Sequence, residues 1–356
     1  MIAYNKEKLK KLLILKEIDE LYEKKLLTEE QYQESRIKYN SGLYTPDIYK
    51  KIWVFIYVAF AVFVFTCLIV HMFSVINKSY NSVGYLFCSV VCFGILEYTI
   101  KVSNHYKSGR HEAFLYLGLF LLLSIVVKIS GGIYGNNHNK LIFSLIYLPI
   151  LIAATIRYSD RLVAFFLNLC FYTVYSLLIL DIGVNALLIL PYAMMLIATI
   201  IYFGSIQLKK KEAFLFWKDC LSIFEVIALI VFYAAGNYCM IKSASIMFID
   251  IHFIKGEIVP SPIVFISFTA LVPLGYVYFG LKNKNKPLLW VGLSFILPSM
   301  LSIEFYYKLH RPYISLIVLG IIMITIATFC IKYLNTPKYG ISSKKGDAEE
   351  ELLIEN

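Results

Sequence analysis

Charged residues are scarce in this sequence. Only 16% of its 356 residues are charged and 59% are hydrophobic, whereas an ordinary soluble domain has about 25% charged residues. Twenty of the charges fall in residues 1–51 and eight in residues 335–356, which leaves thirty for the 283 residues between them. That is too little polar surface to cover a water-soluble globule of this size. The composition predicts a membrane-embedded core with short loops.

Motifs of soluble catalysis are also missing. The sequence has no GxxxxGK[ST], HExxH, GxSxG or GxGxxG, and so lacks the common signatures of phosphate loops, zinc hydrolases, nucleophile elbows and dinucleotide-binding turns. Cys88 and Cys92 lie one helical turn apart, but no adjacent histidine or cysteine completes a metal site. We therefore lean against an enzyme and expect no cofactor and no metal.

The cysteines argue against a disulfide framework. There are seven, an odd number, and all of them fall within or at the edge of an apolar run. We expect them to pack as small hydrophobic side chains.

Ten apolar runs are long enough to cross about 30 Å of hydrocarbon as helices. They predict an all-α, polytopic membrane protein with about ten transmembrane helices. The runs are residues 52–76, 83–100, 113–134, 141–156, 162–180, 186–206, 220–241, 263–281, 288–306 and 313–334.

The distribution of lysine and arginine predicts how the chain is threaded, because cytoplasmic loops retain these residues. With ten spans and a cytoplasmic amino terminus, the inner segments carry 27 Lys and Arg and the outer segments carry seven. Both termini are therefore expected in the cytoplasm, in a multi-pass membrane protein. The net charge of +10 is explained by attraction to anionic lipid of the bilayer, and no nucleic-acid partner is expected.

Residues 1–50 form a separate cytoplasmic module ahead of the transmembrane domain at 51–334, and residues 335–356 form a charged cytoplasmic tail. Residues 6–24 predict a first amphipathic helix. Thr28 starts a second helix, and Gln31 completes a capping box. Tyr32 and Tyr39 are expected to face the first helix. The hairpin is too short to bury a core alone, so it docks on the inner loops, on a second copy or on a partner protein.

The stretch LYEKKLLTEEQY at residues 21–32 resembles the short helical hairpins appended to many bacterial membrane proteins, although Lys25 stands where that family usually has a helix-ending glycine. A wider resemblance rests on FWKDCL (216–221), GNY (236–238), FTALVPLGY (268–276), GLKNK (280–284) and YLNTPKYG (333–340). Together these segments look like a family of bacterial polytopic membrane proteins, typical of Bacteroidota, with an amino-terminal cytoplasmic hairpin. The resemblance implies inner-membrane location, and no activity is implied by it.

Four polar residues within the spans are candidates for an intramembrane site, because ionisable groups in hydrocarbon are costly and often functional. Glu225 is the deepest acid. Asn168 lies at similar depth in the fifth span, and Asn237 lies in the outer half of the seventh. Glu97 is near the inner end of the second span, where an ion pair with Lys101 explains it. For Glu225 a hydrogen-bonded interhelical contact, or a reach toward Lys218, stands beside a proton or cation site.

Two further patterns are left open. Four prolines lie inside spans and kink them, namely Pro149, Pro191, Pro273 and Pro298. Because the eighth and ninth spans are consecutive and both kinked, they could flank a path lined by Ser294, Ser299 and Ser302. The segments EAFLY (112–116) and EAFLF (212–216) are an internal echo compatible with a repeat, or with chance in an apolar chain.

Three functions remain in order of preference. The first is a transporter or permease for a small solute or ion. The second is a membrane-embedded scaffold or sensor that docks a partner through the hairpin. The third is a membrane enzyme acting on lipid or polymer substrates with groups from the loop at 242–262. The substrate, the coupling ion, the direction and the oligomeric state do not follow from the sequence.

Overall fold

The computed structural model of the chain describes residues 2–44, 46–76, 81–103, 106–130, 137–182, 186–237 and 262–307, with 320–321, 324–325 and 328. The chain divides into two compact units, Met1–Leu177 and Leu178–Asn356. All regular elements within the described residues are helices.

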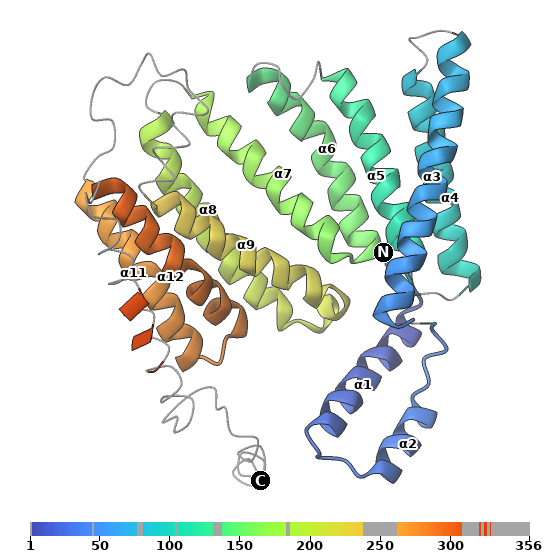
Figure 1. Cartoon of the computed structure of the whole chain (residues 1–356), viewed down its shortest axis with the longest axis horizontal. Helices are drawn as coiled ribbons and strands as arrows, with labels where there is room; N and C mark the ends of the chain where they lie inside the picture. Colours follow the sequence, from blue (N-terminus) through green and yellow to red (C-terminus); the bar gives the residue numbers. More distant parts are fainter. Residues whose placement is uncertain are drawn as a thin grey trace. The chain divides into compact units, whose positions relative to one another are not determined.

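The first unit contains the hairpin and five long helices, of which the last passes the unit boundary by one turn (Figure 1). Its elements are α1 (Lys6–Glu23), α2 (Glu29–Lys38), α3 (Ile48–Ile76), α4 (Asn81–Ser103), α5 (Arg110–Ile129), α6 (Asn137–Tyr158) and α7 (Arg161–Leu180). The second unit contains α8 (Ala186–Lys209), the 3-10 helix η2 (Glu212–Trp217), α9 (Lys218–Gly236), α11 (Pro262–Lys282) and α12 (Lys286–Tyr307).

Within the described residues seven helices are long and apolar enough to cross a membrane, and they coincide with the first seven predicted spans. They are α3 to α8 and the continuous segment Glu212–Gly236. Helices α11 and α12 occupy the places of the eighth and ninth predicted spans, and Lys286–Ser302 of α12 is a shorter apolar helix. The tenth, at 313–334, lies almost wholly outside the described residues. The helices are consistent with an α-helical membrane protein, and the count of ten stays a prediction.

The hairpin has the predicted capping box. The Thr28 side chain accepts from the Gln31 amide, and the Gln31 side chain accepts from the Thr28 amide. Tyr32 faces α1, as predicted: its ring stacks on Tyr22 at 4.2 Å, and its hydroxyl donates to Asp19 at 2.9 Å. These contacts hold α2 against α1 although α2 buries none of its own side chains.

Helix α1 ends in a Schellman motif with lysine at the glycine position. Lys25 has φ +59°. Its amide donates to the Tyr22 carbonyl, and the Leu26 amide donates to the Leu21 carbonyl at 3.0 Å, which is the hydrogen-bond pair of that motif. The left-handed helix end is therefore present without a glycine, and the backbone carries the cost of a left-handed lysine.

The helices α3, α4 and α5 of the first unit pack on one another. Their shared core includes Val62, Cys88, Cys92 and Leu121, so the two thiols pack as small apolar side chains. The Ser89 hydroxyl donates across the interface to the Gly118 carbonyl at 3.0 Å. Among the described residues no group of histidine, cysteine and acidic side chains could hold a metal ion.

In the second unit α8 packs on α9, and α11 and α12 form a close pair. An added Cβ on Gly280 would lie 2.7 Å from the Leu289 amide nitrogen, so this crossing requires glycine. The Ser299 hydroxyl of α12 donates to the Thr269 carbonyl of α11 at 2.5 Å. That carbonyl lies four residues before Pro273, which has no N–H to donate to it. Ser299 thus satisfies the group that the proline leaves free.

Candidate functional site

Glu225 is the most deeply buried acid among the described residues, with 2% of its surface exposed. Its carboxylate pairs with the Lys209 ammonium and accepts from the Asn285 side-chain amide at 2.9 Å. The predicted interhelical contact is therefore present. Its cationic partner is Lys209 at the end of α8, and not Lys218, because the end of α8 lies against α9.

Asn285 joins the ion pair to the start of α12. Its Oδ1 accepts from the Leu288 amide at 3.3 Å, which caps that helix. Its Nδ2 also reaches the Tyr202 hydroxyl, at 3.4 Å, as well as Glu225. The end of α8, the first turns of α9 and the loop between α11 and α12 thus meet at one carboxylate.

Polar contacts continue along the same face of α9. The Tyr276 hydroxyl donates to the Leu229 carbonyl at 3.2 Å. One turn further the Tyr233 hydroxyl accepts from Asn237 at 3.0 Å, and Asn237 also donates to Ser302 of α12 at 3.2 Å. Positions 225, 229, 233 and 237 are four residues apart and share one helix face. We call this set the α9 polar face.

The α9 polar face is long relative to a bilayer. Twelve residues of helix rise span about 18 Å, more than half of a hydrocarbon core of about 30 Å. Tyr233 and Asn237 are each 1% exposed. Position 229 is leucine, packed with Leu288 and Val291, so the polar groups lie in two sets, Glu225 with its partners and Tyr233 with Asn237, and the Tyr276 hydroxyl lies between them at the Leu229 carbonyl. The carboxylate, hydroxyl and amide groups of these sets can coordinate a small polar species.

The other two predicted site residues lie in the first unit. Arg157 holds Glu97 in a two-pronged pair at 2.5 and 2.7 Å, and the Tyr158 hydroxyl donates to it at 2.9 Å. The hydrogen-bonding partners of Glu97 are therefore Arg157 and Tyr158, which the sequence did not predict, and the charge of Lys101 adds a smaller attraction. Asn168 is fully buried and donates to the Ala164 carbonyl at 2.8 Å. Its Oδ1 has no partner among the described residues.

The structure thus divides the four candidates. Glu225 and Asn237 share the α9 polar face. Glu97 and Asn168 have separate partners within the first unit, and neither shares a partner with the other. The loop that carried the enzyme hypothesis lies outside the described residues up to 261, and Pro262 begins α11. The Tyr238 end of the GNY segment also lies outside them.

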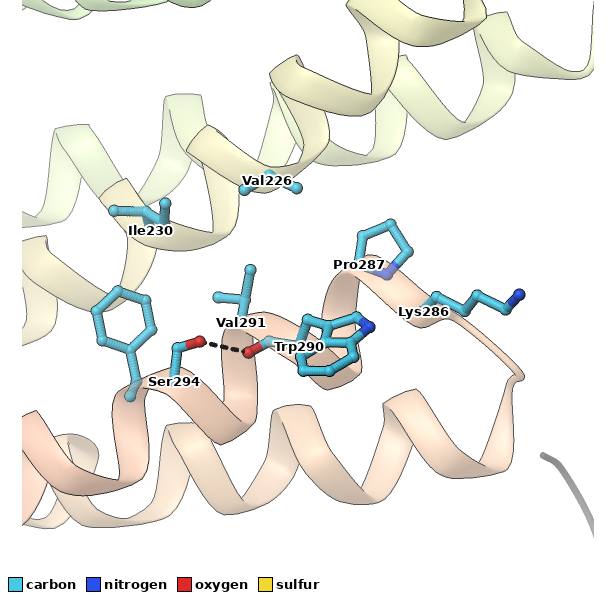
Figure 2. Close-up of a pocket in the computed structure, with 8 residues that line it drawn as sticks. Val226, Ile230, Lys286, Pro287, Trp290, Val291 and Ser294 are labelled. Atoms are coloured by element: carbon cyan, nitrogen blue, oxygen red, sulfur yellow. Dashed lines mark hydrogen bonds between the residues drawn. The ribbon is translucent and has the colours of Figure 1, made fainter. Parts of the chain in front are cut away.

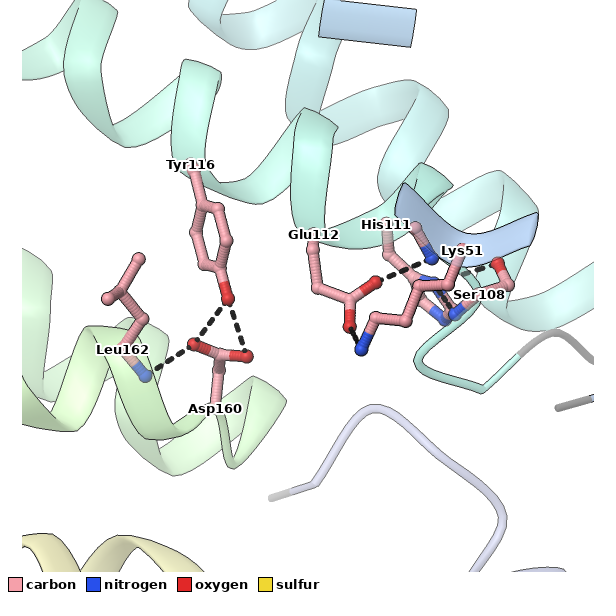
Figure 3. Close-up of polar contacts among 8 residues, drawn as sticks. Lys51, Ser108, His111, Glu112, Tyr116, Asp160 and Leu162 are labelled. Carbon is pink, nitrogen blue, oxygen red and sulfur yellow. Dashed lines mark hydrogen bonds and ion pairs between the residues drawn. The ribbon is translucent and has the colours of Figure 1, made fainter. Parts of the chain in front are cut away.

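A second polar cluster lies at the hairpin end of the first unit, where α3, α5 and α7 begin (Figure 3). Lys51 of α3 pairs with Glu112 at 2.5 Å, and Glu112 also accepts from the Gly109 amide at 2.7 Å. Gly109 has φ +86°, and an added Cβ would lie 2.3 Å from the Lys51 carbonyl. Only glycine allows α3 to approach the start of α5 this closely.

Asp160 completes this cluster by capping α7. Its Oδ1 accepts from the amides of Leu162 and Val163 at 2.9 and 3.1 Å, and the Tyr116 hydroxyl of α5 donates to the carboxylate at 3.1 Å. A carboxylate at a helix amino terminus is favoured by the helix dipole. The cluster therefore joins three helices by ordinary capping chemistry.

The chain ahead of α1 lies against the cluster. The Ala3 amide donates to the Arg157 carbonyl at 2.8 Å, and the Tyr4 ring contacts Tyr106 and His111 at centroid distances of 5.0 and 5.9 Å. Burial, with smaller contributions from Tyr106 and the nearby acids, raises the pKa of Tyr4 far above its usual value. Tyr4 therefore stays neutral and serves as a packing group.

The sequence interpretation did not single out Glu112, Asp160 or Tyr4. Two of them had a readable signal. Glu112 stands three residues after Gly109 at the start of an apolar run, and Asp160 immediately precedes another run, as helix-capping residues do. Tyr4 had none, because its burial depends on residues more than one hundred positions away.

Comparisons with protein-family models, with curated proteins and with solved structures find no match to this chain. The resemblance to the Bacteroidota-type hairpin family accordingly stays a prediction.

Proposed function

We propose that this chain is a transporter for a small solute or ion, and that Glu225 on the α9 polar face is its proton or cation site. The supporting observation is the carboxylate itself: it is 2% exposed, it is shared between Lys209 and Asn285, and it lies on the same helix as the buried Tyr233–Asn237 pair. Burying an ion pair is costly compared with apolar packing. Ion pairs inside membrane helices are accordingly often functional.

The proposed mechanism follows from the opposite charges of the Lys209–Glu225 pair. Protonating Glu225 removes the attraction that holds Lys209 at the end of α8, so the contact between α8 and α9 has two arrangements with different charge. A cation or proton that enters competes with Lys209 for the carboxylate. We propose that both termini are cytoplasmic, on the strength of the 27 to seven division of Lys and Arg. We also propose that the membrane is a bacterial inner membrane, as the family resemblance implies.

Proton flux into proteoliposomes under an imposed potential tests this function. Protein-free liposomes define the baseline, and a pH-sensitive dye inside the vesicles reports the flux. We expect Glu225→Gln to reduce the flux at least tenfold, because glutamine keeps the hydrogen bond from Asn285 but cannot be deprotonated. Glu97→Gln is the matched control and should retain the flux. Flux in Glu225→Gln equal to that of the unaltered protein would overturn the site assignment.

A second candidate, a membrane-embedded sensor or scaffold, is favoured by the attachment of the hairpin. The chain is tied to the first unit on both sides of it, by Ala3 to Arg157 and by the Tyr106 amide to the Tyr44 carbonyl at 3.2 Å. Helix α2 leaves Ile37 79% exposed. A hairpin fixed at its ends with a free outer helix is arranged to present that helix to a partner.

Affinity capture separates the two candidates. If the hairpin recruits a partner, Ile37→Glu should remove the co-purifying protein, and Lys38→Glu, one position further on, should not. The same captured set in the unaltered protein and in Ile37→Glu would count against the sensor. Neither substitution touches the α9 polar face, so proton flux should be unchanged in both.

A further inference from the structure

An apolar groove lies on the second unit between α9 and α12 (Figure 2). It has a volume of about 470 Å³. Val226 and Ile230 line it from α9, and Val291 and Phe295 line it from α12. Ser294 adds no free donor to the lining, because its hydroxyl donates to the Trp290 carbonyl of its own helix at 2.8 Å.

One end of the groove is cationic and aromatic. Lys286, the first residue of α12, lies there with Pro287 and Trp290. Lys286 is exposed and Trp290 is 68% exposed. No acidic side chain of the described residues lines the groove. Glu225, the residue next to Val226, is held by Lys209 and Asn285, so within the described part of the chain it does not compensate the charge of Lys286.

The length of the groove fits one leaflet. From Lys286 to Phe295 the rise of α12 is about 14 Å, close to half of a hydrocarbon core of about 30 Å. Tryptophan at such an end is typical of the membrane–water interface, and lysine there reaches the headgroup layer. The groove thus runs from headgroup level to about the bilayer midplane.

We propose that this groove binds one anionic phospholipid. An acyl chain lies along the apolar lining, and the headgroup phosphate binds the Lys286 ammonium beside the Trp290 indole. Charge complementarity selects the occupant: a second copy of this chain would bring no surplus of negative charge, since the chain carries 34 Lys and Arg against 24 Asp and Glu. The proposal depends on the membrane placement of the helices and is independent of transport.

Quenching of Trp290 fluorescence by brominated lipid tests the proposal in the full chain. The protein has three tryptophans, so Trp53→Phe with Trp217→Phe leaves Trp290 as the only reporter. The protein is placed in nanodiscs of phosphatidylcholine that contain increasing fractions of phosphatidylglycerol brominated on its acyl chains. The matched series contains brominated phosphatidylcholine in unbrominated phosphatidylcholine. We expect the brominated anionic lipid to reach half-maximal quenching at about a fivefold lower fraction than brominated phosphatidylcholine does. This is the preference that the attraction of one lysine to an anionic headgroup gives.

Substitutions test whether the preference for anionic lipid arises at the groove. Lys286→Gln should abolish the fivefold preference, and Lys286→Arg should keep it. Lys101→Gln is the control, because this exposed lysine lies near the end of α4 in the first unit. Val226→Phe should reduce quenching by both lipids, since its ring fills the groove. Equal quenching by the two lipids in the unaltered groove would overturn the proposal, as would a preference that survives Lys286→Gln. Absence of quenching at every lipid fraction would indicate a protein occupant and would also contradict it.

Discussion

The two units of this chain place their buried polar groups differently. In the first, Lys51–Glu112, Glu97–Arg157 and Tyr116–Asp160 all lie at the hairpin end of the helices. In the second, polar contacts begin with Lys209–Glu225 and continue along α9 to Asn237. Both units use charged pairs between helices and hydrogen bonds deeper in, such as Ser89 to Gly118 in the first, but among the described residues the acid with the smallest exposed fraction lies in the second.

This difference separates structural contacts from a candidate path. At the end of a helix, water and headgroups lower the cost of charge, and capping groups are needed there anyway. Deeper polar groups have no such compensation, so a buried carboxylate is retained against a cost. The proposed function accordingly assigns the polar species to the second unit, while the first unit holds both ends of the hairpin.

The largest expected difference between the units is the loss of stability when the lysine of an ion pair is replaced. Lys209→Met should lower the free energy of unfolding by about 3 kcal/mol, because it leaves Glu225 buried with only Asn285 as partner. Lys51→Met is the counterpart in the first unit, where the Lys51 side chain is 36% exposed and Glu112 keeps the Gly109 amide. It should cost about 1 kcal/mol. Unfolding in mixed micelles by titration with SDS measures both, and equal costs would remove the distinction between the units.

A smaller effect is expected at the cap of α7. Asp160→Ala removes the acceptor for two backbone amides and for Tyr116, and should cost about 1 to 2 kcal/mol. Asp181→Ala, an exposed acid just after the same helix, should be neutral within about 0.5 kcal/mol. If the two substitutions cost the same in the SDS titration, the cluster at the hairpin end does not stabilise the first unit.

The contact between Ser299 and Thr269 should be weaker still. Ser299→Ala is expected to cost about 0.6 to 1 kcal/mol, the range of single hydrogen bonds between membrane helices. The control is Ser124→Ala in the first unit, because Ser124 donates only to the Phe120 carbonyl of its own helix at 3.1 Å. A loss in thermal stability for Ser299→Ala no larger than for Ser124→Ala would contradict the role assigned to Ser299 beside Pro273.

The smallest expected change is a local increase in stability at the hairpin. Lys25→Gly should stabilise the end of α1 by up to about 1 kcal/mol, because glycine adopts φ +59° without steric cost. The measurement is hydrogen exchange at the Leu26 amide in the full chain, which should slow. Lys24→Gly should not slow it, since Lys24 has φ −77°. Faster exchange in Lys25→Gly would show that the lysine side chain, and not the backbone, holds the motif.

Much of the architecture could be predicted from local sequence. Thr28 with Gln31 marks a capping box, and an apolar run of about twenty residues between charged loops marks a helix that can cross a membrane. Both signals depend on neighbours in the chain alone. For the same reason Glu225 could be recognised as the deepest acid before its partners were known.

The similarity between residues 112–116 and 212–216 shows that local sequence does not always determine the type of helix. The first segment begins α5, with Glu112 buried and capping against Gly109. The second begins the 3-10 helix η2, with no side-chain cap at Lys211 and with Glu212 exposed. Nearly identical residues adopt different helices because Gly109 and Lys51 are present at one copy and have no counterpart at the other.

The sequence by itself determined that this chain is helical and apolar enough for a membrane, where the hairpin turns and which acid is deepest, because hydropathy, spacing and capping act within a few residues. Only the tertiary structure decided that Lys209 and Asn285 meet Glu225, that Arg157 holds Glu97, and that an apolar groove opens beside Lys286. Those contacts join residues up to 60 positions apart, and they depend on which helix faces pack together.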